Sequence, residues 1–93
     1  MKKLIIARHA KSSWKDSSLR DFYRPLNKRG RIDGPIMSNY LREIFPSIDL
    51  LHSSSSVRTF ETSAYFTSKI NFKKIKFDKD LYHSSSSLLV KKI

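Results

Sequence analysis

The first apolar run of the chain is the feature that most constrains its fold. The run extends from Leu4 to Ala7 and ends directly at Arg8 and His9. A short, continuous apolar run bounded by charge is typical of a buried strand, so Lys3–Ala7 is predicted to be one. In a parallel sheet, ligands bind beyond the carboxyl ends of the strands. We therefore expect Arg8 and His9 to stand at the end of a strand, where such a sheet carries its chemistry.

The next patterned segment predicts a helix. Asn27 is its expected N-cap and Phe45 lies near its end, while Gly34-Pro35 marks either a kink or the start of the regular part. The apolar residues at helical spacing in this segment are Ile32, Ile36, Tyr40, Leu41 and Ile44. This spacing indicates one apolar face along the predicted helix.

The remaining segments complete an α/β pattern. Residues 48–52 and 75–78 are predicted strands, and a helix through about Lys69 is predicted between them, with Ser55 or Ser56 as its cap. Residues 88–93 are expected to be amphipathic. Strands that alternate with helices at these connection lengths indicate a parallel sheet covered by helices, in a single domain over residues 1–93.

One long connection precedes the first predicted helix. Residues 8–25 are polar and lack sustained periodicity, so they are predicted to form a loop. A loop of that length in a small domain is more often functional than idle. Trp14 is expected to pack this loop onto the body of the protein.

Composition sets the broad class of the protein. Nineteen basic and eight acidic residues give a net charge of +11, which attracts anions such as phosphate esters, phosphoproteins and nucleic acid. A solvated, lysine-rich surface explains the same charge without any partner. The chain has no cysteine, and its apolar runs are too short to span a membrane. The basic start followed by a short apolar run is not a signal peptide, so a soluble, cytoplasmic protein is expected.

The predicted strand ends can gather the groups that bind a phosphoryl group. The serine run Ser53–Ser56 and Arg58 follow the second predicted strand, as Arg8 and His9 follow the first. If these strands are neighbours, two guanidinium groups, an imidazole and a helix N-terminus converge, and the imidazole can attack phosphorus. Each group also has a purely structural interpretation, because loop histidines, strand-end arginines and capping serines are common without any site.

No metal and no cofactor are expected. The histidines His9, His52 and His83 lie far apart, without the spacing of metal ligands. The two glycines, Gly30 and Gly34, do not form a glycine-rich phosphate loop. The predicted chemistry therefore depends on side chains and backbone N–H groups of the protein alone.

Three motifs follow one another along the chain. They are Arg8-His9-Ala10-Lys11-Ser12-Ser13-Trp14, then Arg24-Pro25-Leu26-Asn27-Lys28-Arg29-Gly30, then Ser53-Ser54 through Arg58 with Glu61-Thr62. Together they resemble the histidine phosphatase superfamily and, within it, the SixA-type phosphohistidine phosphatases. The resemblance implies a phosphoglycerate-mutase-like α/β fold and hydrolysis through a phosphohistidine intermediate, without a metal.

Carried over to this sequence, the resemblance implies a role for individual residues. It makes His9 the nucleophile, with Arg8 and Arg58 as the arginines that bind the phosphoryl group. Ser12, in the first motif, joins the two arginines among the predicted substrate-binding residues. His83 follows the segment where many superfamily members place a general acid, and it is predicted only to line the site.

The sequence departs from the family pattern at three places. Ser55 replaces a usual proline, and Tyr23 replaces a usual aspartate. The second catalytic histidine of the family, typically in a Gly-His-Asn context, has no counterpart here. The chain is therefore expected to be a truncated domain, equal to roughly the N-terminal half to two-thirds of such an enzyme. Losing one partner of a preorganised site typically costs about 10²–10³ in rate, so weak or no hydrolysis is expected.

Three functions are consistent with these patterns. The first is a phosphohistidine phosphatase-like protein that acts on a phosphorylated protein or a small phosphorylated molecule. The second is a non-catalytic remnant that binds phosphate or a phosphoprotein. The third is a basic nucleic-acid-binding module, ranked last because the aromatic residues fall at predicted core positions and no recognition motif occurs. No membrane partner is expected, and the sequence predicts no oligomeric state.

Overall fold

The computed structural model describes residues 2–82. The amphipathic stretch predicted at residues 88–93 lies outside this range. The elements in chain order are a 3-10 helix η1 (Asp21–Tyr23), α1 (Lys28–Ile44), β1 (Ser47–Ser54), α2 (Val57–Thr67), β2 (Asn71–Asp78) and a 3-10 helix η2 (Lys79–Leu81). The alternation of helices and strands from α1 to β2 follows the order that the sequence predicted.

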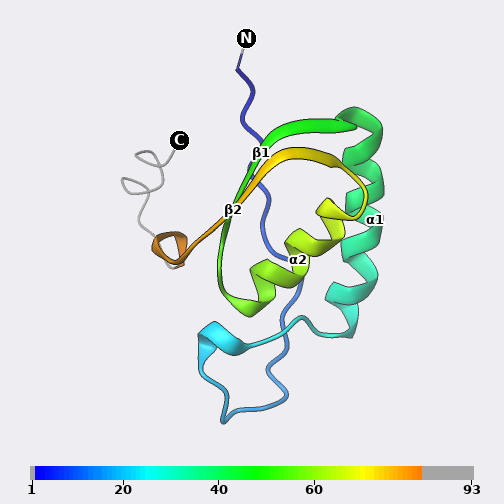
Figure 1. Cartoon of the computed structure of the whole chain (residues 1–93). Coiled ribbons are helices and arrows are strands. Elements are labelled where there is room, and N and C mark those ends of the chain that lie inside the picture. Colours follow the sequence, from blue (N-terminus) through cyan, green and yellow to red (C-terminus); the bar gives the residue numbers. More distant parts are fainter. Residues whose placement is uncertain (1, 83–93) are drawn as a thin grey trace.

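The two strands form a parallel pair, and α2 is the crossover between them. The register runs from Ser47 opposite Asn71 to Ser54 opposite Asp78. Figure 1 shows α2 between the strand pair and α1, and α2 contacts both strands as well as α1. A parallel pair needs a long crossover connection, and here a helix supplies it. The predicted fold class, a parallel sheet covered by helices, is confirmed.

The prediction of a first strand at Lys3–Ala7 is wrong. The segment is irregular, and Leu4, Ile5 and Ile6 are 60%, 39% and 75% exposed. Within residues 2–82, no backbone hydrogen bond joins it to β1 or β2, and Figure 1 shows it as a trace beside the other elements. An apolar run predicts burial, but a strand also needs a neighbouring strand to satisfy its backbone groups.

Helix α1 begins where the sequence placed its cap. The Asn27 side chain accepts a hydrogen bond from the Gly30 backbone N–H at 2.8 Å, which satisfies one donor of the first turn. Pro35 lies inside the helix, so the regular part does not start at that residue. The cap residue and the helical period are local signals, which explains why this boundary was predictable.

The face that α1 buries consists of small residues. Gly30, Gly34 and Ser38 are the buried positions of the helix, one turn apart. A Cβ atom at Gly34 would overlap the Tyr65 ring, so the glycine permits α1 to approach α2 closely. Four of the five apolar residues of the predicted face are instead exposed, including Ile36 at 59%, and Leu41 is half-buried.

The aromatic residues are also more exposed than predicted. Trp14, Tyr40 and Phe60 are 76%, 60% and 54% exposed, so the expectation that aromatic residues fill the core is wrong for the part of the chain that is described. In the same range, the buried hydrophobic side chains are Leu26 and Ile70. Seven buried residues are polar or charged: Ser12, Arg24, Ser38, Ser56, Arg58, Thr62 and Ser63. No helix among residues 2–82 is both long and apolar enough to cross a membrane.

Candidate functional site

The Asp21 carboxylate binds three side chains that are far apart in the sequence. Arg58 donates from Nη1 to the Asp21 backbone oxygen at 2.6 Å and from Nη2 to Oδ2 at 2.9 Å. Arg24 donates from Nε and Nη2 to Oδ1 at 3.1 and 3.0 Å. The Tyr82 hydroxyl donates to Oδ2 at 2.6 Å. One acid therefore joins η1, the first turn of α2 and the residue that follows η2.

The contact between Tyr82 and Asp21 changes the titration of the phenol. The hydrogen bond to the carboxylate raises the pKa of Tyr82 above its ordinary value, because the ionised phenolate would lose that bond and face a like charge. Tyr82 also packs edge-on against Phe22, with ring centroids 5.0 Å apart. The phenol therefore stays a neutral hydrogen-bond donor at physiological pH.

Arg24 fixes the segment that follows His9. Its Nη1 donates to the Ser12 hydroxyl at 2.8 Å and to the Ser13 backbone oxygen at 3.2 Å. Its guanidinium carbon lies 3.5 Å from the centre of the Trp14 ring. Trp14 therefore stacks at the surface on a buried arginine of the same loop, and the prediction that it packs the loop onto the body of the protein is wrong.

Backbone contacts hold the same segment from two sides. Residues 12 and 26 form an antiparallel bridge, and the Asn27 N–H donates to the Lys11 oxygen at 2.9 Å. A Cβ atom at Gly30 would overlap that Lys11 oxygen, so only glycine permits the approach. On the other side, the Ala10 N–H donates to the Thr62 hydroxyl at 3.0 Å.

Thr62 links the His9 segment to the turn that carries Arg58. Its hydroxyl accepts from Ala10 and donates to the Arg58 backbone oxygen at 2.7 Å, one helical turn earlier. The residue after His9 is therefore tied to the same helix as Arg58. The structure thus attaches both predicted site segments to α2, although Lys3–Ala7 forms no strand.

The His9 ring has one defined hydrogen bond. Its Nδ1 lies 2.7 Å from the Ala10 backbone oxygen. A carbonyl oxygen only accepts, so Nδ1 carries a proton, and in the neutral tautomer that fits this contact the lone pair is on Nε2. That nitrogen has the electronic form of a nucleophile. Arg8 is exposed, and its side chain makes no hydrogen bond or ion pair within residues 2–82.

The Arg58 guanidinium has one nitrogen without a hydrogen-bond partner in the described part of the chain. Asp21 takes a hydrogen from each terminal nitrogen, whereas Nε is buried and has no partner among the described residues. Arg58 is only 7% exposed, and a buried N–H without a partner costs free energy. Nε is therefore an unsatisfied donor that the surrounding protein atoms enclose. Ser55 Oγ, two residues before α2, is likewise buried without a partner in this part of the chain.

The predicted site residues are thus partly gathered. Arg58 donates directly to the Asp21 carboxylate. Ser12 is linked to Asp21 through Arg24, which already donates a hydrogen bond to the Ser12 hydroxyl. His83 lies outside the described residues. Asp21 was not predicted, and the one local signal for it is its position three residues before Arg24, where it forms an ion pair at 3.0 Å.

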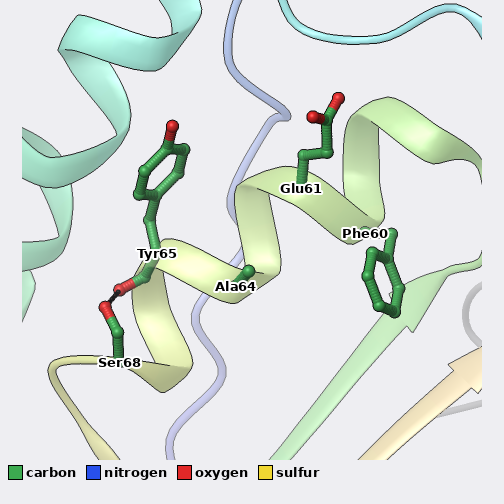
Figure 2. A pocket seen from close by; sticks show the side chains of 5 residues that line it. All are labelled: Phe60, Glu61, Ala64, Tyr65 and Ser68. Carbon is green, nitrogen blue, oxygen red and sulfur yellow. Dashed lines mark hydrogen bonds between the residues drawn. The ribbon is translucent and has the colours of Figure 1, made fainter.

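The described part of the structure also has surface hollows. One is a hollow of about 430 Å³ along α2, lined by Phe60, Glu61, Ala64, Tyr65 and Ser68. Figure 2 shows the side chains that line this hollow along α2, with the Ser68 hydroxyl donating a hydrogen bond to the Tyr65 backbone oxygen. Glu61 already accepts from the Leu26 N–H at 2.9 Å. This hollow contains no predicted site residue.

Metal-binding groups do not cluster in residues 2–82. No group of three or more histidine, aspartate or glutamate side chains lies close enough to hold an ion there. His52 and Asp78 form a pair at 3.0 Å across the two strands, but a pair alone does not make a metal centre.

Three solved structures that resemble this chain are all of proteins named SixA. A candidate phosphohistidine phosphatase SixA from Agrobacterium tumefaciens superposes with a TM-score of 0.77 at 27% identity, over 90% of this chain and 54% of that one. A candidate SixA from Nakamurella superposes with a TM-score of 0.76 at 24% identity, over 91% of this chain and 46% of that one. A protein histidine phosphatase SixA complexed with tungstate gives a TM-score of 0.73 at 18% identity, over 90% and 54% of the two chains.

Sequence comparison adds one relative. An uncharacterized chloroplastic protein of Arabidopsis thaliana is 44% identical over 61 residues, which are 66% of this chain and 28% of that protein. No family model matches the chain. The chain thus spans about half the length of the solved structures that it resembles, and less of the plant protein.

Proposed function

We propose that this chain, which has the fold of the SixA-type phosphohistidine phosphatases, binds a phosphoryl group beside His9 and accepts it on that side chain. The observation that carries the proposal is Arg58. It is a buried guanidinium on the first turn of α2, held by Asp21 with its Nε edge unbonded in the described part of the chain. A fixed, buried cation at a helix N-terminus is suited to a dianionic group.

The chemistry that we propose has two steps. The lone pair of His9 Nε2 attacks phosphorus, the phosphorus–nitrogen bond of the substrate breaks, and the leaving nitrogen takes a proton from water. Water then attacks the phosphoryl group on His9 and releases inorganic phosphate. Arg58 and Arg8 balance the charge on the phosphoryl oxygens as the bonds change.

The same proposal specifies the extent of the domain, the class of substrate and the rate of hydrolysis. Residues 1–93 act as one phosphoryl-binding unit, and the substrate is a protein phosphohistidine or a small phosphoramidate. The second catalytic histidine that the resemblance implies has no counterpart in this sequence. We therefore expect these residues by themselves to form the His9 adduct faster than they hydrolyse it, because a missing member of a preorganised site costs about 10²–10³ in rate.

Intact-mass analysis tests the proposal. The 93-residue chain is incubated with a small phosphoramidate, beside His9→Ala as the matched control. An acid-labile phosphoryl adduct on the parent and none on the control is the expected result. A chain that is folded by circular dichroism and forms no adduct contradicts transfer.

Binding without transfer is the second candidate function. It is favoured by one observation, namely that the contacts that hold Arg58 come from Asp21 and do not involve His9. Inorganic phosphate would then protect Arg58 from a guanidinium-modifying reagent although no adduct forms. If phosphate gives no protection, this candidate is excluded.

A further inference from the structure

A second surface hollow lies on the chain segment that follows His9. It has a volume of about 710 Å³ and is formed between residues 11–15 and residues 25–31. Its cationic side chains are Lys11, Lys15, Lys28 and Arg31. Among the described residues that line it, none carries a carboxylate. We call this hollow the basic groove.

The lysines of the basic groove form no ion pair within residues 2–82. Lys11, Lys15 and Lys28 are exposed, and within residues 2–82 none of them lies within 4.0 Å of a carboxylate. Elsewhere in the same range, Arg29 pairs with Asp33 at 3.0 Å and Lys73 with Asp49 at 3.4 Å. No ion pair of the described residues therefore offsets the positive charge of the groove lysines, in a chain that already carries +11.

The groove is built on a fixed floor. The Ser13 N–H donates to the Pro25 oxygen at 2.8 Å, and the Ser12 hydroxyl accepts from Arg24. Trp14 forms one wall, with the Arg24 guanidinium against its ring. The walls are therefore held in place before any ligand arrives, which lowers the entropy cost of binding.

We propose that the basic groove binds an acidic stretch of polypeptide next to the phosphorylated side chain of a protein substrate. The substrate's identity rests on the proposed function, but the groove's preference for acidic peptide does not. Lys11 is two residues from His9, so the groove continues from the segment that would hold the phosphoryl group. Complementary charge across such an interface steers encounter and fixes register.

The groove's contents favour carboxylates over a nucleic acid. Reading bases requires free donors and acceptors or an open stacking face. Here Ser12 Oγ and the Ser13 N–H are already bonded, and the Arg24 guanidinium occupies one face of the Trp14 ring. A single phosphate ion is also much smaller than this hollow. Flexible lysine ammonium groups suit a row of carboxylates.

Trp14 makes the groove measurable, because it is the only tryptophan of the chain and lines the hollow. The 93-residue chain is titrated with an oligoglutamate peptide at low salt while tryptophan fluorescence is followed. The test variant is Lys15→Glu/Lys28→Glu, and the charge-matched control is Lys69→Glu/Lys74→Glu, at exposed positions outside the groove. Glutamate at residue 28, in the first turn of α1, favours the helix dipole, so the test variant should fold.

We expect saturable binding that is weakened about tenfold by the test variant and less than twofold by the control. Equal weakening by both variants would mean that only the general basicity of the chain matters, and would overturn the proposal. The absence of binding to the parent would also overturn it. Tighter, groove-dependent binding of an oligothymidylate of equal charge would identify a nucleic-acid groove instead.

A second measurement connects the groove to phosphoryl transfer. Two phosphohistidine peptides are compared, one with glutamates beside the phosphohistidine and one with alanines. The parent should form the His9 adduct about tenfold faster from the acidic peptide, and Lys15→Glu/Lys28→Glu should lose that preference. Equal rates from both peptides would show that the groove does not act on the substrate. The fluorescence titration does not use His9, so a failure of adduct formation and a failure of the groove are distinguishable.

Discussion

The segment before His9 and the segment after it differ in how they are held. Residues 4–6 are apolar and exposed, and they make no backbone hydrogen bond to either strand within the described range. Ala10, Lys11 and Ser12 are polar or small, yet each bonds to α2, to the residues before α1 or to Arg24. In this structure, specific polar contacts fix the candidate site where apolar burial does not.

The largest effect should follow from Asp21→Ala. The substitution leaves two buried arginines without their shared acid, so we expect a loss of about 2–3 kcal/mol in the free energy of unfolding, measured in urea. Asp21→Asn, which keeps the shape and one acceptor oxygen, should lose about half as much. A loss below about 0.5 kcal/mol for Asp21→Ala would show that the polar cluster does not hold this region.

Thr62→Val tests the link between α2 and the His9 segment. It removes the hydroxyl that accepts from Ala10 and should cost about 1 kcal/mol. We also expect slower adduct formation on His9, because its segment loses an anchor. Thr67→Val, at the exposed end of the same helix, is the matched control and should leave the adduct rate unchanged. Equal rates for the two variants would contradict the anchoring role.

The pH dependence of stability tests the contact between Tyr82 and Asp21. The pKa of Tyr82 is raised above its ordinary value of 10.0 in the folded state, so its hydrogen bond contributes fully below pH 10 and is lost as pH rises through the folded-state value. The parent should therefore be more stable than Tyr82→Phe below pH 10, and the difference should shrink at higher pH. Thermal unfolding of both proteins between pH 7 and pH 11 measures this, and a constant difference would contradict it.

The smallest effect should follow from Ile6→Ala. Ile6 is 75% exposed, so the change in unfolding free energy should stay within about 0.5 kcal/mol. A loss above about 2 kcal/mol, which is typical of a buried isoleucine, would show that the run before His9 is buried in solution. That result would remove the contrast between the two segments.

The predictable parts of the fold are those with local signals. Helix α1 has a capping asparagine and a helical period, and both act within a few residues of each other. β1 was predicted from a short, largely apolar segment and β2 from alternating apolar and polar residues, although each is longer than predicted because strand pairing extends beyond the apolar residues. Residues 3–7 have an equally good apolar run but no strand partner in the described range, so a local pattern could not decide their structure.

The candidate site was predictable only where a motif carried it. Arg8, His9 and Arg58 follow from the resemblance, and their catalytic roles stay predictions. Asp21 has no apolar period and no motif of its own. Its role depends on contacts with residues 37 and 61 positions away, which no local pattern contains.

The sequence by itself determined the helix and strand types of the middle of the chain, its basic charge and the motifs that relate it to the SixA-type fold. The tertiary structure decided which face of α1 is buried, namely the glycine and serine face, because Tyr65 fits only against a residue without a side chain. It also decided that Asp21 joins Arg24, Arg58 and Tyr82. Periodicity and caps arise from neighbours in the chain, whereas packing faces and shared carboxylates arise only when distant segments meet.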